Sequence, residues 1–210
     1  MRKTLVSAIA LGCAAFGANA ASAQSTTDSG APERGATFRG IRIEGNIGGD
    51  RFRSQGRHHD KLGYGATAGW DGMIGNRFIF GPEASFWRAN DWNEICAPGG
   101  AGGTVCQKSF EEWSVGGRVG MLVTPNLLVF GRGAYVTNEQ RKRFDAPAGQ
   151  TGYYDHYNTV GYQVGGGVEY SLGRDVMHMP LYVGAQYVYS QYHDHTSRQR
   201  LMGSIGVRFR

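Results

Sequence analysis

After its N-terminus the sequence lacks any run of about 18 apolar residues, which excludes membrane spans made of helices. It also lacks the Gly-X-Y period of collagen. Its 34 glycines and 6 prolines together stay below the level of a low-complexity chain, and 12% aromatic residues are too many for a disordered chain. A transmembrane β-barrel stays possible, because its strands alternate apolar and polar side chains and so have a mild mean hydropathy.

The N-terminus has the pattern of a secretory signal peptide. Arg2 and Lys3 precede apolar or small residues over 4–17, and small residues end the segment at Ala23. The apolar part is too short to span a bilayer as a helix, and the small residues are typical of a cleavage site. We therefore expect cleavage after Ala23, which removes two cations and lowers the formal net charge from +5 to +3.

The mature chain is predicted to form one domain. Residues 24–37 are rich in Ser, Thr, Asp, Gly and Pro, the composition of a flexible tail. The remaining residues are enough for one folded domain. The predicted organisation is a cleaved signal peptide over 1–23, a flexible tail over 24–37 and a folded domain over 38–210.

The cysteines predict a disulfide. Cleavage removes Cys13, although Leu11-Gly12-Cys13 also loosely resembles the acylation site of a lipoprotein. Cys96 and Cys106 remain, separated by a glycine-rich segment that permits ring closure. Exported proteins form disulfides readily, whereas a metal site would need further His or Cys ligands at suitable spacing. We therefore predict a Cys96–Cys106 disulfide.

The domain consists of segments in which apolar side chains recur at every second position. In the first segment, Ile41 and Ile43 alternate with Arg42 and Glu44. A period of two over segments this long predicts strands, because successive side chains of a strand point to opposite faces. The predicted strands are 38–48, 62–73, 77–88, 110–123, 127–137, 157–172, 179–190 and 200–210.

The connections between these strands alternate between long and short. The short ones include Gly75-Asn76 and Pro125-Asn126, which are typical turn residues. Short turns at one end and long loops at the other are typical of an up-and-down barrel in an outer membrane. We therefore predict an all-β fold, an eight-stranded antiparallel up-and-down transmembrane β-barrel. One irregularity is expected at Arg132, which falls on the apolar face of 127–137 and indicates a bulge or register change.

Four stretches resemble those of one known family. Residues 113–135 resemble the Arg-x-Gly-Tyr, turn, Tyr-x-x-Gly-Gly-x-Ala stretch of the small outer-membrane β-barrel family, which includes OmpA-like barrels and alphaproteobacterial surface antigens. Residues 161–172 and 81–86 resemble its Gly-x-Gly-x-Glu-Tyr and Gly-x-Glu-Ala strands. Residues 203–209 are similar to its C-terminal strand, although Arg210 follows where the family ends on an aromatic residue. The resemblance implies the bacterial outer membrane, contact with its lipid, and the barrel assembly machinery as a partner during biogenesis.

Charged residues on the polar face predict a filled interior. Glu44, Glu83, Arg118 and Glu169 point away from the apolar face and so into the lumen. Eight strands leave an interior just wide enough for side chains, and buried charges need partners. We expect ion pairs and little passage of solutes; a narrow porin is the alternative. The family often has Glu where this chain has Gln186, which puts a charge network on that wall in doubt.

The long connections carry many basic residues. On an outer surface these cations can bind the phosphates of lipopolysaccharide, since guanidinium suits phosphate bidentately; the alternative is ordinary solvated loops. Nucleic acid is a poor partner, because +3 on an exported chain is a weak electrostatic footprint. The candidate contacts are Arg51, Arg53, Arg57, Lys61, Arg141, Lys142 and Arg143.

The sequence offers three other interpretations. His58-His59 and His193-Asp-His195 offer metal ligands, but no third ligand is fixed. His195-Thr-Ser197 resembles the His-x-Ser pair of lipid A deacylase barrels, but no acidic residue follows Ser197 to orient the histidine. A soluble lipocalin-like barrel would have to enclose too many large rings. We therefore expect no catalytic residue, cofactor or metal, and a small monomeric barrel with an envelope-structural or surface-interaction role.

Overall fold

The computed structural model describes residues 38–209 except 55–56, 90–92, 100–101, 177–178 and 194–195. The predicted signal peptide and tail lie outside the described residues. Across the part of the chain that is described, no helix has the length and apolar character needed to cross a membrane.

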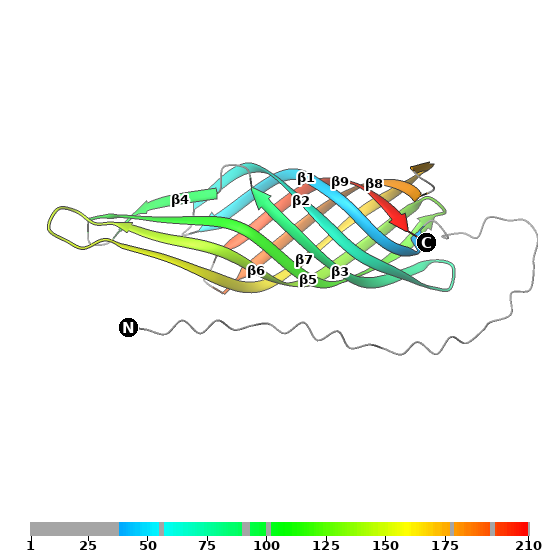
Figure 1. Ribbon diagram of the computed structural model, residues 1–210, viewed down its shortest axis with the longest axis horizontal. Helices are drawn as coiled ribbons and strands as arrows, with labels where there is room; N and C mark the ends of the chain where they lie inside the picture. Colours follow the sequence, from blue (N-terminus) through cyan, green and yellow to red (C-terminus); the bar gives the residue numbers. More distant parts are fainter. Residues whose placement is uncertain are drawn as a thin grey trace, which may run out of the picture. The chain divides into compact units, whose positions relative to one another are not determined.

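The described residues form one closed antiparallel sheet (Figure 1). Its strands are β1 (Gly40–Ser54), β2 (Arg57–Ile74), β3 (Phe78–Ala89), β4 (Asn93–Pro98), β5 (Thr104–Thr124), β6 (Leu127–Asp145), β7 (Tyr153–Val176), β8 (Met179–Tyr192) and β9 (Ser197–Phe209). The short β4 continues the line of β3 along the same edge of β5. The other eight strands pair in chain order, and β1 pairs with β9 to close the ring. The predicted eight-stranded up-and-down barrel is confirmed.

The two ends of the barrel differ. β1 begins opposite the end of β9, since Ile41 pairs with Phe209, and the short turns at 75–77 and 125–126 lie at this same end. Short turns of outer-membrane barrels face the periplasm. We therefore call this end the periplasmic end and the opposite one the outer end.

Polar side chains face the interior of the barrel and apolar side chains face outward. Along β1, Arg42 is 1% exposed and Ile41 is 54% exposed, and the alternation continues along the strand. The cause is the period of two, which sends neighbouring side chains to opposite faces. A soluble lipocalin-like barrel has the reverse arrangement, so that interpretation does not fit.

Strand β6 differs from the expectation at Arg132. Leu128, Phe130, Arg132 and Val136 share one face, but this face is the interior, and all four side chains are buried. The pairing of β6 with β7 runs through Arg132 without a shift, and the shifts in its pairing with β5 lie elsewhere. The predicted bulge is therefore wrong: the strand is regular, and its apolar residues fill the barrel.

The outer connections are strands for most of their length. β5 has 21 residues and β7 has 24, whereas about 9–11 suffice to cross a bilayer. The prediction of long outer loops is therefore wrong, because the backbone pairing continues beyond the apolar alternation. We call the outer parts of four neighbouring strands, at residues 93–98, 104–110, 139–145 and 153–160, the projecting ribbon (Figure 1).

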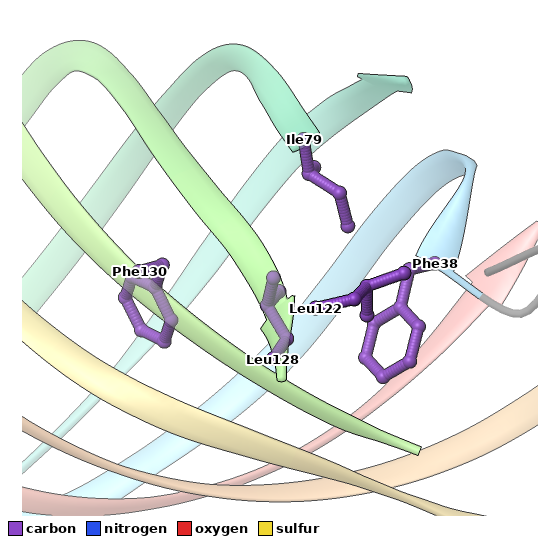
Figure 2. Packing of buried hydrophobic residues seen from close by; sticks show 5 residues of the cluster. All are labelled: Phe38, Ile79, Leu122, Leu128 and Phe130. Carbon is purple, nitrogen blue, oxygen red and sulfur yellow. The ribbon is translucent and has the colours of Figure 1, made fainter. Parts of the chain in front are cut away.

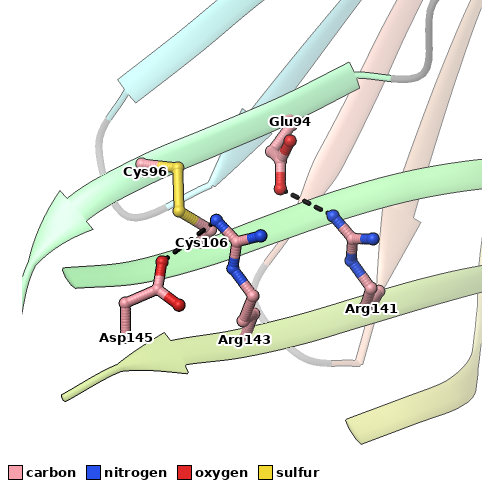
Figure 3. Close-up of a disulfide and its surroundings, with 6 residues drawn as sticks. All are labelled: Glu94, Cys96, Cys106, Arg141, Arg143 and Asp145. Atoms are coloured by element: carbon pink, nitrogen blue, oxygen red, sulfur yellow. Dashed lines mark hydrogen bonds and ion pairs between the residues drawn. A yellow bond between two sulfur atoms is a disulfide. The ribbon is translucent and has the colours of Figure 1, made fainter. Parts of the chain in front are cut away.

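A disulfide fastens the edge of the projecting ribbon. Cys96 of β4 lies directly opposite Cys106 of β5, and the two sulfur atoms are bonded (Figure 3). The predicted disulfide is confirmed. Among the described strands β4 pairs with β5 alone, so the covalent link secures a strand that has hydrogen-bonding partners on one side.

Inward-facing glycines allow the wall to curve tightly. A Cβ atom on Gly81 would lie 1.6 Å from the carbonyl oxygen of Trp70, and one on Gly116 would lie 2.1 Å from that of Gly133. Neither position has room for a side chain unless the backbone moves. This close approach explains part of the high glycine content.

The described chain begins inside the barrel and turns into the wall. Phe38 is fully buried and packs with Ile79 and Leu122 (Figure 2), and its ring centroid lies 4.9 Å from the guanidinium carbon of Arg208. Gly40 then has a φ of +112°, a conformation that residues with side chains rarely adopt. This glycine lets the chain pass from the interior into β1.

Candidate functional site

The outer face carries a belt of exposed apolar side chains. Near the periplasmic end, Trp70 and Phe80 form an edge-to-face pair, and Phe86 packs against Trp113 nearer the outer end. Aromatic rings along both edges of an apolar band are typical of membrane interfaces. Other members of the belt are Ile43, Ile47, Leu62, Tyr64, Val115, Val119, Tyr135, Tyr162, Val164, Val168, Tyr170, Tyr187, Leu201 and Ile205. Lipid therefore surrounds this part of the barrel.

Eight buried charged side chains form one network inside the belt, which we call the periplasmic cluster. It holds four arginines and four carboxylates, so its formal charge is zero. Every barrel strand except β8 contributes to it. Its members are Arg42, Glu44, Asp71, Glu83, Arg118, Arg132, Glu169 and Arg208.

In one half of this cluster Arg42 reaches three carboxylates. Its guanidinium nitrogens lie 2.7 Å from Glu83, 3.1 Å from Glu44 and 3.6 Å from Asp71. The second carboxylate oxygen of Glu83 lies 2.7 Å from Nε of Arg132. The planar fork of arginine suits such shared contacts, because it offers five donors in fixed directions.

In the other half, two arginines share two carboxylates. Arg118 donates to both oxygens of Asp71, at 2.9 and 2.7 Å, and Nε of Arg208 lies 3.3 Å from the same carboxylate. Both arginines also pair with Glu169. Buried charges are tolerated only with close partners, and here each carboxylate has at least two.

A second, smaller network lies toward the outer end, and we call it the outer cluster. Arg200 lies 2.6 Å from Glu112, and Arg198 lies 3.1 Å from Asp50. The indole nitrogen of Trp87 donates to Asp50 at 3.2 Å. Two arginines and two carboxylates again give a formal charge of zero.

Three apolar layers border these clusters. The periplasmic layer includes Phe130, whose ring centroid is 5.1 Å from the guanidinium carbon of Arg118. The middle layer includes Trp87, whose ring centroid is 5.4 Å from the guanidinium carbon of Arg200. The outer layer includes Tyr192, whose hydroxyl donates to Glu112. The layers are Phe38, Ile79, Leu122, Leu128 and Phe130 (Figure 2); Trp87, Val188 and Met202; and Phe52, Ile95, Val136 and Tyr192.

Little space remains where the two clusters meet. A cavity of about 10 Å³ is lined by Arg132 of the periplasmic cluster and Arg200 of the outer cluster, which is room for about one water molecule. At the outer end, uncharged side chains bond to one another: Ser54 to Gln107 at 2.7 Å, Gln107 to Gln140 at 2.7 Å, and Gln140 to Thr196 at 3.2 Å. The interior is thus occupied by paired side chains along its length.

The structure brings the predicted lumen charges together. All four lie in the periplasmic cluster: Glu44, Glu83, Arg118 and Glu169. Four further members of that cluster were not among the predicted lumen charges: Arg42, Asp71, Arg132 and Arg208. Arg42 and Arg208 lie on the polar face and alternate with apolar residues of the opposite face, so the period of two could have identified them. Arg132 could not be identified in this way, because its neighbours on the inward face are apolar.

Three of the basic residues predicted to contact lipopolysaccharide lie on the projecting ribbon. Arg141 pairs with Glu94 at 2.8 Å, and Arg143 pairs with Asp145 at 3.0 Å (Figure 3). Lys142, between them, faces the other side of β6 and is half-buried. Two of these three cations are therefore balanced by a neighbouring acid.

The other basic candidates lie on the β1–β2 hairpin, separate from the ribbon. Arg51 donates two hydrogen bonds to Asp60, at 2.7 and 2.9 Å, and these bonds hold the pKa of the Asp60 carboxyl below its ordinary value. Arg53 is exposed and Lys61 is half-buried. The backbone of Arg57 lies in β2, and its side chain lies outside the description. The basic candidates therefore lie on two separate surfaces.

Among the described residues, few side chains support a catalytic or a metal site. Ser197 is buried, and His195 lies outside the described residues. Within the described ranges, the group of three metal-capable side chains is Glu94, Cys96 and Cys106, and the disulfide occupies both sulfurs.

Comparison with known proteins extends this description. No protein-family model and no curated protein matches the chain. Among solved structures, Ail, the attachment invasion locus protein of Yersinia pestis, has a TM-score of 0.52 at 15% identity, over 81% of this chain and 99% of Ail. The fold is that of a small outer-membrane β-barrel. Ail in complex with the heparin analogue sucrose octasulfate has a TM-score of 0.51 with the same identity and coverage. Neisserial surface protein A has a TM-score of 0.44 at 13% identity, over 80% of this chain and 97% of that protein. The fold and the apolar belt together place the barrel in the bacterial outer membrane.

Proposed function

We propose that this protein is a closed, non-enzymatic outer-membrane barrel that presents a rigid surface outside the cell. The observation that carries the proposal is the interior, which two neutral clusters and three apolar layers fill from end to end. A transporter needs a passage, and a hydrolase needs an accessible nucleophile with a base. After export and removal of residues 1–23, the barrel assembly machinery inserts the chain as a monomer.

The projecting ribbon is suited to contacts outside the membrane. Its strands are paired and its edge is held by the disulfide. Tyr153 and Tyr154 are exposed on it beyond the apolar belt, and Arg141 lies 5.5 Å from the Tyr154 ring. Tyrosine and arginine dominate the energetics of protein contact surfaces.

The partner that the outer cations favour is lipopolysaccharide. Arg53 is exposed above the belt and can donate to a lipid A phosphate. The structurally similar Ail has been obtained with sucrose octasulfate, and its sulfates are anionic groups of the same kind as these phosphates. This likeness supports an anionic partner.

Conductance in a planar bilayer tests the closed interior. We expect no steady conductance above that of the bare bilayer. A large, steady conductance would overturn the proposal in favour of a narrow porin. Incubation with lipid A should release no acyl chains by mass spectrometry, and their release would establish an enzyme.

Binding to lipopolysaccharide tests the surface role. Purified protein is titrated with lipopolysaccharide micelles and followed by the shift in its thermal unfolding. We expect Arg53→Gln to weaken the shift and Arg77→Gln, which removes an exposed cation at the periplasmic end, to leave it unchanged. Equal shifts in the wild type and both variants would show that Arg53 does not bind lipopolysaccharide.

A further inference from the structure

A groove of about 490 Å³ lies on the wall of the barrel at its periplasmic end. Trp70 and Phe80, which are 47% and 41% exposed, form its aromatic walls, and Arg39 and Gly40 form its rim. Asp71 of the periplasmic cluster also lines the groove, but its side chain is fully buried. The groove therefore opens where the apolar belt meets the periplasmic surface.

Two glycines create this groove. At Gly72, a Cβ atom would lie 2.8 Å from the Trp70 ring and 3.1 Å from the Phe80 ring, so the absence of a side chain lets both rings lie against the sheet. Gly40, with its φ of +112°, turns the chain so that Phe38 is buried inside and Arg39 is exposed at the rim.

Within the described ranges, no acidic side chain balances the charge at the rim. Among the described residues Arg39 has no hydrogen-bond or ion-pair partner. The carboxylate bordering the groove is that of Asp71, which is fully buried and held by Arg118 at 2.7 Å. A cation thus stands at one end of a hollow whose walls are apolar, at the level of the membrane surface.

We propose that this groove binds one phospholipid of the inner leaflet, with its phosphate on Arg39 and its glycerol and first methylenes against Trp70 and Phe80. Guanidinium binds phosphate through two parallel hydrogen bonds. The volume is within the range of about 300–1,000 Å³ typical of small-molecule sites, enough for a headgroup and part of a chain. The proposal requires that the barrel spans the membrane and does not depend on the role of the outer end.

Native mass spectrometry of the whole mature protein in detergent, titrated with dioleoyl phosphatidylglycerol, tests the proposal. The wild-type protein should retain a single phospholipid. Arg39→Gln should lower its affinity about tenfold, as expected for losing a hydrogen bond between charged groups. Gly72→Ala keeps every charge but pushes the rings outward, and should also weaken binding. Arg77→Gln removes an exposed arginine of the turn at the same end and should bind as the wild type does.

Several outcomes would overturn the proposal. Equal losses in Arg39→Gln and Arg77→Gln would show general attraction of an anionic lipid, and no loss in Arg39→Gln would exclude the phosphate contact. Displacement of the lipid by excess inorganic phosphate would indicate a free-anion site. If Gly72→Ala does not fold, Trp70→Ala removes one wall instead, and unchanged binding there would exclude the groove. Conductance and lipopolysaccharide binding are independent of these results, so the two proposals fail separately.

Discussion

The interior and the outer surface both use arginine–carboxylate pairs at the same distance, yet the pairs differ in their surroundings. Arg118 and Asp71 lie 2.7 Å apart with side chains 1% and 0% exposed. Arg51 and Asp60 also lie 2.7 Å apart, but are 51% and 55% exposed. Water screens the outer pair and offers each group another partner, whereas the inner charges depend on each other. Distance alone therefore does not tell what a salt bridge contributes.

This difference in surroundings assigns stability to the interior pairs and recognition to the outer surface. The interior pairs are connected, so a change at one residue affects several others. The outer pairs are isolated, and their loss leaves groups that water can solvate. We expect substitutions to act on stability through the interior and on recognition through the outer surface.

The largest effect is expected from Arg118→Met. This change leaves Asp71 and Glu169 with one fewer cation in a buried site, and the free energy of unfolding should fall by about 3–5 kcal/mol. Guanidinium unfolding of the protein in lipid vesicles measures it. Arg118→Lys keeps the charge but not the planar guanidinium, and its free energy of unfolding should fall by less. A loss within experimental error would mean that water reaches the cluster.

Removal of the Phe38 ring should have the next largest effect. Phe38→Ala leaves a cavity in the periplasmic layer beside Ile79 and Arg208, and unfolding should become easier by about 3 kcal/mol. Conductance should stay absent, because the middle and outer layers remain. Phe38→Leu, which refills most of the volume, is the control. Steady conductance of the alanine variant would show that Phe38 alone closes the barrel.

The disulfide should stabilise the pairing of β4 with β5 and not the rest of the barrel. Replacing Cys96 and Cys106 by serine should ease the opening of β4 from β5 by about 2–3 kcal/mol, while the unfolding of the barrel stays unchanged. Hydrogen exchange over 93–109, compared with exchange in β1, separates these effects. An equal increase in both regions would show that the ribbon and the barrel unfold as one unit.

The smallest effect is expected for Arg51→Gln, which should leave stability unchanged within error. The folded pKa of Asp60 lies below its unfolded value because Arg51 donates to it. The contribution of this pair is therefore present above the unfolded pKa, about 3.9, and is lost as the pH falls through the folded pKa. Titration of the Asp60 carboxyl by NMR should show its pKa rising in the variant. An unchanged pKa would mean that the pair does not form in solution.

The sequence predicts the barrel within its apolar belt but not its outer extension. In the belt, Ile41 and Ile43 alternate with Arg42 and Glu44, so one face is identifiable. In the ribbon, Lys108 and Arg141 alternate with Gln107 and Gln140. Both faces are then polar and the apolar alternation disappears, although the backbone pairing continues.

The lumen charges could be predicted residue by residue, but their pairing could not. Alternation assigns Arg118 and Glu169 to the inner face, yet these residues are 51 positions apart in the chain and meet only across the barrel. Arg132 shows a second limit, because apolar layers also occupy the interior. A face with Leu128 and Phe130 on it therefore does not have to be the lipid face.

The periplasmic cluster draws its charges from seven of the eight barrel strands, and this distribution bears on how the barrel assembles. The partners of one arginine lie on several strands: Arg42 of β1 pairs with Glu44 of β1, Asp71 of β2 and Glu83 of β3, and Arg208 arrives on β9, the last strand. In an open sheet many of these charges would lack their partners. The membrane would suit only the apolar face of such a sheet, and water only the charged face. Arg208 completes the neutral set of eight only when β9 joins β1, so we expect ring closure and the burial of the interior to be one cooperative step.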